Sequence, residues 1–280
     1  MKIVVIGTTG MLGSAVMRFL TARGHTVTAI TRKEYDIEAL APIESLPLST
    51  HDAIINCAGI INRRSEIVPA QTSYTVNSLF PRLLADRAAA LDIPLIHIST
   101  DCVFDGTKGR YTEDAPMSAT TLYGRSKFFG EPANALVLRT SIIGPEEKNF
   151  YSLLCWFLAQ EKTCQGYTNH LWNGITTLEL ARVSLAILER GLWQPVLRHV
   201  HGESVSKHAL LGKMAKAFGK SISIVPSAPA QAHDMRLATR YPDFLEGLDI
   251  QPLDAQLAEV KRHSDTKGHW LAKNPLERTA

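Results

Sequence analysis

The chain has 280 residues, of which 45% are hydrophobic, and its formal net charge is +3. That length and apolar content are enough for one large globular unit or two joined ones. Because the charge is small and both signs are interspersed, the strongly basic stripe of a nucleic-acid-binding protein is missing, and we expect no nucleic-acid partner.

Apolar runs and cysteines indicate the compartment. The first residues, MKIVVIGTTG, contain an apolar run that glycine interrupts too soon for a signal peptide. The sequence has no uninterrupted run of about 18 apolar residues, the length that a membrane helix needs. The four cysteines form no C-x-x-C pair. We therefore expect a reduced, soluble, cytoplasmic protein with no membrane partner.

The first half of the chain alternates between strand-like and helix-like segments. Residues 2–7, KIVVIG, form a β-branched run, residues 10–24 have helical periodicity, and residues 25–31 are again rich in β-formers. The alternation continues with strands expected at 51–59, 93–100 and 135–144 and helices at 76–92 and 121–133. This order predicts an α/β fold with a doubly wound parallel sheet of the Rossmann type.

The rhythm changes after residue 145. Helices are expected within 149–162, 176–191, 206–219 and 254–263, and short strands within 196–202 and 221–227. Residues 166–174, GYTNHLWNG, show no regular period, and the tail 264–280 has little pattern, so we expect it to be partly disordered. We interpret residues 1–145 as a nucleotide-binding unit and residues 146–280 as a smaller α/β substrate lobe with segments that return to the main sheet.

A glycine-rich turn joins the first strand to the first helix. GTTGMLG places Gly7, Gly10 and Gly13 where a backbone can approach a diphosphate whose charge meets the helix N-terminus. Close packing of strand on helix is the alternative explanation. At the end of the second strand, Arg32 and Lys33 favour the 2′-phosphate of NADP(H), although Arg32 could instead stack on adenine or face solvent, and NAD(H) stays an alternative.

A hydroxyl, a phenol and an ammonium follow in order at the same expected edge of the sheet. Ser99 and Thr100 end the strand at 93–100, and Tyr123 and Lys127 lie one helical turn apart. A nearby ammonium lowers the pKa of a phenol, so Tyr123 could give its proton to a carbonyl oxygen that Thr100 orients. An ordinary solvated helix face would also carry this spacing.

Together, GTTGMLG, STDCVFDG, YGRSK and LRTSIIG resemble the extended short-chain dehydrogenase/reductases, closest to the dTDP-4-dehydrorhamnose reductase group. The resemblance is strong over residues 1–145 and looser beyond. It implies an NADPH-dependent oxidoreductase that reduces a nucleotide-linked 4-keto-6-deoxysugar in polysaccharide precursor synthesis, and a chain able to form a homodimer. Thr100, Tyr123 and Lys127 are then catalytic. The cofactor lies along Gly7, Thr9, Gly10, Met11, Leu12, Gly13, Arg32, Lys33, Asn56, Cys57, Ala58, Gly59, Asn77, Ser99, Tyr123 and Lys127.

The resemblance also places the sugar pocket. Cys102 stands where the group usually has Tyr, and Ile142 where it usually has Trp; Trp172, Asn173 and Arg236 complete the expected substrate-binding set. Arg63 and Arg64 could clamp a substrate diphosphate or be solvated loop cations. We assign no metal. Two other functions stay open: a nucleotide-sugar epimerase or dehydratase with tightly bound NAD, and a non-catalytic regulatory subunit of the same fold.

Overall fold

A sheet of six parallel strands forms the centre of the molecule. The computed structural model describes residues 1–146 and 150–266. The strands lie in the order β10 (Leu197–His199), β5 (Leu136–Arg139), β4 (Leu95–Ile98), β3 (Ala53–Asn56), β1 (Lys2–Ile6) and β2 (Thr26–Ile30), and every neighbouring pair is parallel. The expected Rossmann-type α/β fold is confirmed.

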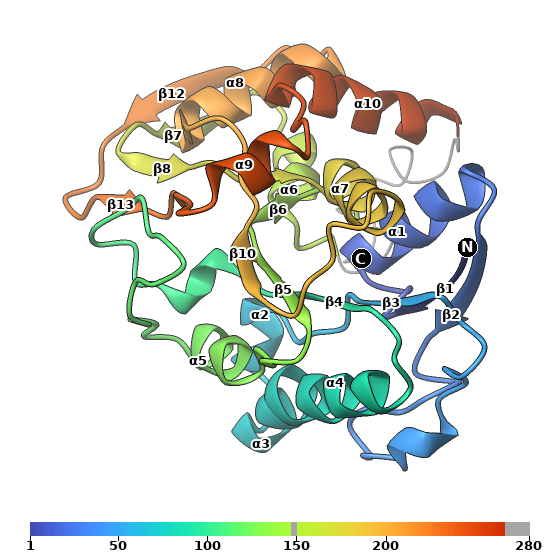
Figure 1. The fold of residues 1–280 in the computed structure, drawn as a ribbon. Coiled ribbons are helices and arrows are strands. Elements are labelled where there is room, and N and C mark those ends of the chain that lie inside the picture. Colours follow the sequence, from blue (N-terminus) through green and yellow to red (C-terminus); the bar gives the residue numbers. More distant parts are fainter. Residues whose placement is uncertain (147–149, 267–280) are drawn as a thin grey trace, which may run out of the picture.

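The sheet is buried on both faces because its strands carry apolar side chains on both. Ile3 and Val5 of β1 pack with α1 (Met11–Ala22) and α7 (Thr177–Glu189), whereas Val4 and Ile6 pack with α4 (Phe80–Ala90). Figure 1 shows α1 and α7 above the sheet and α4 below it. Each of these buried side chains contributes about 1.5–3 kcal/mol through the removal of apolar surface from water.

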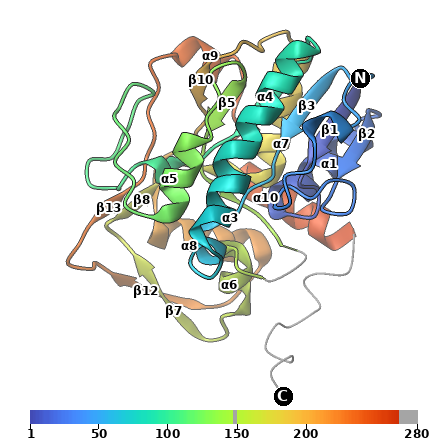
Figure 2. The ribbon, with the colours of Figure 1, turned by 90° about the horizontal axis from the view of Figure 1, so that it is seen from below.

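The helix expected at 76–92 is part of a longer helical segment. It begins with α3 (Ala70–Tyr74), passes through a π-helical turn at Thr75–Leu79 and continues as α4. Beside that turn lies α5 (Leu122–Phe129), the segment expected to be helical at 121–133 (Figure 2). The widened turn matters for the site because its buried Asn77 bonds to the loop that follows β3.

Residues after 145 form a group of short strands and helices at one end of the sheet (Figure 1). β7 (Thr163–Tyr167) pairs with β12 (Ser223–Ser227), and β8 (His170–Trp172) lies between β11 (Val205–Ser206) and β13 (His233–Asp234). β6 (Ile142–Ile143) pairs with β9 (Ile175–Thr176). The helices here are α6 (Leu153–Ala159), α8 (Lys207–Phe218), α9 (Pro242–Glu246) and α10 (Leu253–Thr266), and the short turns elsewhere are 3₁₀ at Ile43–Ser45 and Asp101–Val103 and α2 at Asn62–Ser65.

Two segments differ from expectation. The strand expected at 135–144 breaks at Thr140 and Ser141, because β5 pairs within the main sheet whereas β6 pairs with β9. Residues 166–174 are largely extended, since β7 and β8 find partners more than 30 residues away. β10, which lies after residue 145, is a segment that returns to the main sheet, where it forms an edge strand. The part of the tail beyond Thr266 lies outside the described residues.

Candidate active site

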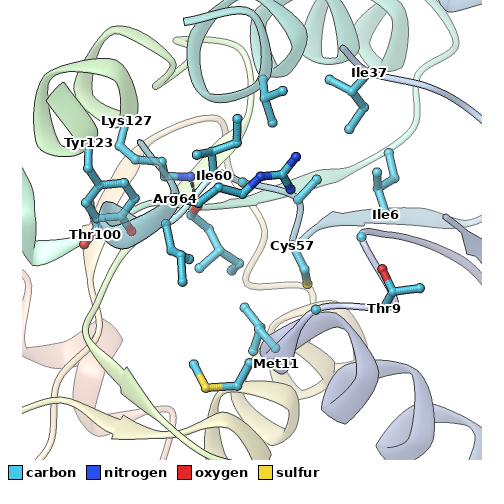
Figure 3. A pocket seen from close by; sticks show the side chains of 18 of the residues that line it. Ile6, Thr9, Met11, Ile37, Cys57, Ile60, Arg64, Thr100, Tyr123 and Lys127 are labelled. Atoms are coloured by element: carbon cyan, nitrogen blue, oxygen red, sulfur yellow. Dashed lines mark hydrogen bonds between the residues drawn. The ribbon is translucent and has the colours of Figure 1, made fainter. Parts of the chain in front are cut away.

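A cavity of about 1020 Å³ opens at the carboxyl ends of the central strands. Its wall is formed by the turn after β1, the segment after β2, the loop after β3, the end of β4 and part of α5, together with Ser141, Ile142, Glu146 and Tyr151. Ligands of doubly wound sheets bind at this edge because the loops after the strands converge there. Figure 3 looks into this cavity.

The glycine turn fits a dinucleotide. Gly7 has φ +83°, and a Cβ there would lie 2.8 Å from the backbone of Ala58. A Cβ on Gly13 would lie 2.2 Å from the carbonyl oxygen of Gly7, so Gly13 packs the helix on the turn and does not line the cavity. The backbone from Gly10 to Leu12 begins α1 without a side-chain cap. The N–H of Gly10 itself donates to the carbonyl oxygen of Gly7 at 3.0 Å, so the N–H groups that suit a diphosphate are those of the first turn of α1 that follow it.

The basic end of the cavity is built differently from expectation. Arg32 and Arg64 both donate to the same oxygen, Oε1 of Glu38, and the Arg64 Nη2 distance is 2.7 Å. All three residues line the cavity, whereas Lys33 is exposed and does not. Arg63, the neighbour of Arg64, instead lies over the ring of Tyr151, 5.4 Å from its centroid. The two adjacent arginines therefore serve different parts of the cavity.

Two buried amides hold the loop after β3. Asn56 accepts from the backbone N–H of Ala58 at 3.1 Å and bonds to the ring of His97. Asn77 bonds to both the N–H and the carbonyl oxygen of Ile60, at 2.8 and 2.9 Å, and donates to Ser126. Neither amide lines the cavity. Both position the backbone of Cys57, Ala58 and Gly59, which does.

Thr100, Tyr123 and Lys127 meet at one wall of the cavity, as Figure 3 shows. Thr100 follows β4, accepts from the N–H of Cys102 at 3.1 Å and donates to Asp101 at 3.2 Å. α5 begins at the Thr121 cap and packs so closely that a Cβ on Gly124 would lie 2.0 Å from the carbonyl oxygen of Cys102. Helix and strand end are thus held in fixed positions.

Burial dominates the electrostatics of this set. The ammonium of Lys127 is 4% exposed, donates to the carbonyl oxygen of Ile98 at 2.7 Å, and has its pKa lowered to about 8, although Glu131 and Cys57 oppose the change. Burial raises the pKa of the Tyr123 phenol above its ordinary value, and the hydrogen bond with Thr100 acts in the opposite direction. The expected lowering of the Tyr123 pKa is therefore not observed in this geometry.

The expected substrate residues separate into two groups. Cys102 and Ile142 line the cavity, as does Ser99, which donates to Glu131 at 2.6 Å. Trp172, Asn173 and Arg236 do not: the indole of Trp172 donates to Ser141 at 2.8 Å, Asn173 bonds to the N–H and carbonyl oxygen of Leu237, and Arg236 pairs with Asp234. Trp172 therefore supports the wall through Ser141, whereas the partners of Asn173 and Arg236 do not line the cavity.

Sequence reasoning missed several residues that line the cavity. Glu38, Glu146 and Tyr151 lie in stretches with no motif, and only the aromatic character of Tyr151 beside the cleft offered a signal. Over residues 1–146 and 150–266, no three His, Cys, Asp or Glu side chains gather closely enough to hold a metal ion. Within the same ranges, no helix has the length and apolarity needed to cross a membrane.

Comparison with known proteins places the chain in a family of reductases and their relatives. The family model described as "RmlD substrate binding domain" matches residues 1–240. A dTDP-4-dehydrorhamnose reductase from Mycolicibacterium smegmatis is 29% identical over 216 residues, 73% of this chain and 65% of that protein. Methionine adenosyltransferase 2 subunit beta from Xenopus tropicalis is 30% identical over 243 residues, 78% of this chain and 72% of that protein.

A solved structure shows the same fold. The crystal structure of dTDP-4-dehydrorhamnose reductase from Bacillus anthracis in complex with NADP superposes with a TM-score of 0.77 at 18% identity, covering 94% of this chain and 99% of that one. At this identity the likeness concerns the fold.

Proposed function

The chain belongs to the RmlD substrate binding domain family, and on that basis we propose that it reduces the carbonyl of a nucleotide-linked 4-keto-6-deoxysugar with NADPH. The observation that carries the proposal is the placement of Thr100, Tyr123 and Lys127 in one cavity with the glycine turn. The reductase names of the relatives support the substrate class. A nicotinamide cofactor, when bound, supplies the hydride for the carbonyl carbon.

The protein's own residues handle the proton. Tyr123 donates its phenolic proton to the carbonyl oxygen, so that hydride and proton together convert the ketone to an alcohol. The phenol is protonated near neutral pH at its ordinary pKa, and burial raises that pKa further, so the proton stays on Tyr123 until the carbonyl oxygen becomes basic. Thr100 donates to the same oxygen and holds it in place, and the Lys127 charge on the same helix stabilises the phenolate that remains.

The basic end of the cavity supports NADPH over NADH. The guanidinium groups of Arg32 and Arg64 both donate to one carboxylate oxygen of Glu38. A phosphate oxygen in the place of that carboxylate oxygen would accept from both groups. A 2′-phosphate at this position would pair with Arg32 and Arg64 and displace Glu38. In NADH the 2′-hydroxyl would instead donate to the Glu38 carboxylate.

This cofactor preference has a direct binding test. Replacing Arg64 with Met should weaken NADPH binding about tenfold or more and leave NADH binding nearly unchanged, since only the phosphate loses a partner. Replacing Glu38 with Gln should strengthen NADPH binding by removing a competing charge. Arg63→Met is the matched control on the same loop, and titration of nicotinamide fluorescence gives the dissociation constants. Equal losses for both cofactors in Arg64→Met would overturn the assignment.

Turnover is tested by absorbance of NADPH with a panel of dTDP-, UDP- and GDP-linked 4-keto sugars. A reductase consumes one NADPH per sugar reduced, whereas an epimerase or dehydratase that recycles NAD consumes none. Tyr123→Phe should abolish turnover and keep NADPH binding, and Tyr74→Phe, an exposed tyrosine outside the cavity, should behave as wild type. If wild-type protein consumes no NADPH with any sugar of the panel, the reductase proposal is refuted.

A subunit role is the second candidate, because the Xenopus relative is named as a subunit of another enzyme. Such a role requires no turnover and would tolerate loss of the phenol. The presence of Thr100, Tyr123 and Lys127 in one cavity favours catalysis. If wild-type protein turns over and Tyr123→Phe does not, the catalytic role is supported over the subunit role.

A further inference from the structure

A largely buried carboxylate follows the helix that carries Tyr123 and Lys127. α5 ends at Phe129, and a Cβ on Gly130 would lie 1.7 Å from the carbonyl oxygen of Asn77, so the backbone packs directly on the π-helical turn. Glu131 comes next; its side chain is 11% exposed and does not line the cavity. The close packing at Gly130 therefore fixes where this carboxylate lies.

Three donors hold the Glu131 carboxylate. Arg139 of β5 donates from Nε at 2.8 Å and from Nη2 at 2.7 Å, and its buried guanidinium lies over the rings of Phe104 and Phe128. The third donor is the hydroxyl of Ser99, at 2.6 Å. Ser99 is a residue of the cavity wall, so one hydrogen bond joins the buried ion pair to the site.

Lys127 and Glu131 contact consecutive residues at the end of β4. The ammonium of Lys127 donates to the carbonyl oxygen of Ile98 at 2.7 Å, and the carboxylate of Glu131 accepts from Ser99. These two contacts connect the C-terminal end of α5 to the end of β4. Because Thr100 is the next residue of the chain, the connection also fixes Thr100 relative to α5.

Glu131 also supplies negative charge to the surroundings of Lys127. Cys57 and His97 interact electrostatically with Lys127 as well, but burial raises the pKa of Cys57 to about 12 and lowers that of His97, so both are uncharged near neutral pH. The Glu131 carboxylate opposes the lowering of the Lys127 pKa by burial. Arg139 offsets part of this charge, and removal of Glu131 would leave that cation without its partner.

We propose that Glu131 is a positioning residue of the reaction: through Ser99 it fixes the end of β4, and its charge keeps Lys127 protonated while Tyr123 gives up its proton. The proposal rests on the proposed function and deepens it. Arg139 holds the carboxylate in place, whereas proton transfer stays with Tyr123. An ion pair that only stabilised the fold would leave the pH dependence of turnover unchanged.

The charge is tested with Glu131→Gln, which keeps an acceptor for Ser99 and removes the negative charge. With NADPH and a 4-keto sugar that wild-type protein reduces, the alkaline limb of kcat should move from about pH 8 to lower pH by about one unit. The loss in kcat should therefore be small at about pH 6 and about tenfold at about pH 9, while KM stays within about twofold. A loss of stability with an unchanged pH profile would show that Glu131 is structural and overturn the proposal.

Glu179→Gln is the matched control. Glu179 on α7 is also a buried carboxylate; it pairs with Arg182 through two hydrogen bonds of 2.6 and 3.0 Å and does not line the cavity. This variant should lose stability and keep the wild-type pH profile, and an equal shift in both variants would count against Glu131. If Glu131→Gln does not fold, its combination with Arg139→Met takes its place, since removal of both charges leaves neither unpaired.

The contact with β4 is tested with Ser99→Ala, which leaves the ion pair intact. We expect kcat to fall about tenfold at every pH, with the NADPH dissociation constant within about twofold of wild type, because the end of β4 loses its connection to Glu131. Ser99→Thr restores a hydroxyl and should recover most of the loss. A wild-type kcat in Ser99→Ala would overturn the positioning role.

Failure of the proposed function would be visible separately, because the pKa of Lys127 can be measured without turnover. Protein isotope-labelled at the lysine Cε atoms is titrated by NMR, and Lys127→Met identifies the signal. Lys127 should titrate near pH 8 in wild type and in Glu179→Gln, and at lower pH in Glu131→Gln. This shift in a protein that reduces none of the sugars would refute the reductase and still support the action of Glu131 on Lys127. Equal titration in wild type and Glu131→Gln would overturn that action.

Discussion

The buried ammonium of Lys127 should make the free energy of unfolding rise with pH in alkaline solution. Its pKa falls from the usual 10.5 to about 8 because burial disfavours the charged form. In the unfolded chain the proton is held up to about pH 10, so the unfolded state binds more protons than the folded state between about pH 8 and pH 10. Stability from this group therefore rises with pH across that window.

The magnitude follows from the two pKa values. Their difference corresponds to about 3 kcal/mol, of which about 2.5 kcal/mol is regained between about pH 7 and about pH 10. In Lys127→Met this group is absent. The free energy of unfolding of the variant, relative to wild type, should therefore fall by about 2.5 kcal/mol over the same range.

Urea unfolding followed by circular dichroism at several pH values measures this difference. Groups that Lys127 does not touch contribute equally to both proteins and cancel in the difference; one of them is the half-buried Cys102 thiol, whose raised pKa acts in the opposite direction. Lys216→Met, which removes an exposed lysine, should show no such dependence. A difference between wild type and Lys127→Met that stays constant from pH 7 to pH 10 would refute the reasoning from burial.

Three further substitutions have calculable effects. Gly13→Ala places a Cβ 2.2 Å from the carbonyl oxygen of Gly7. We therefore expect the free energy of unfolding, measured by thermal unfolding, to fall by about 1–3 kcal/mol and NADPH to bind at least tenfold more weakly. Normal NADPH binding would contradict the role of the turn. Arg139→Met leaves a buried carboxylate without its ion-pair partner, so the free energy of unfolding in urea should fall by about 3–5 kcal/mol. The exposed Arg240→Met should lower it by about 0–1 kcal/mol. Equal losses in the two variants would argue against burial as the cause. Asn173→Ala leaves the backbone N–H and carbonyl oxygen of Leu237 without these partners, so the free energy of unfolding should fall by about 2–4 kcal/mol. KM should change little in the protein that remains folded, and kinetics at low temperature can check this.

How much of this was predictable from the sequence depends on the distance between interacting residues. The glycine turn, the strand end at Thr100 and the pair on α5 each lie within one local segment, so their patterns were sufficient. β7 and β8 were not predicted because their residues are polar or aromatic and become strands only through partners distant in the chain. The pairing of Arg64 with Glu38 spans 26 residues and leaves no local pattern, so the sequence offered Arg64 only as a clamp for a substrate diphosphate or as a solvated loop cation.

Within the site, the residues of the proposed proton transfer lie in local segments, whereas the wall beside them depends on contacts between residues distant in the chain. Thr100 follows β4 and Tyr123 lies on α5, and these segments pack so closely that a Cβ on Gly124 would lie 2.0 Å from the carbonyl oxygen of Cys102. On the proposed function, the wall at Ser141 would face the sugar; it is supported by Trp172 on β8, whose position depends on pairings formed after residue 145. Changes in those later segments can therefore alter which sugar fits while the proton-transfer geometry stays fixed. A family with one fold and several sugar substrates needs this division.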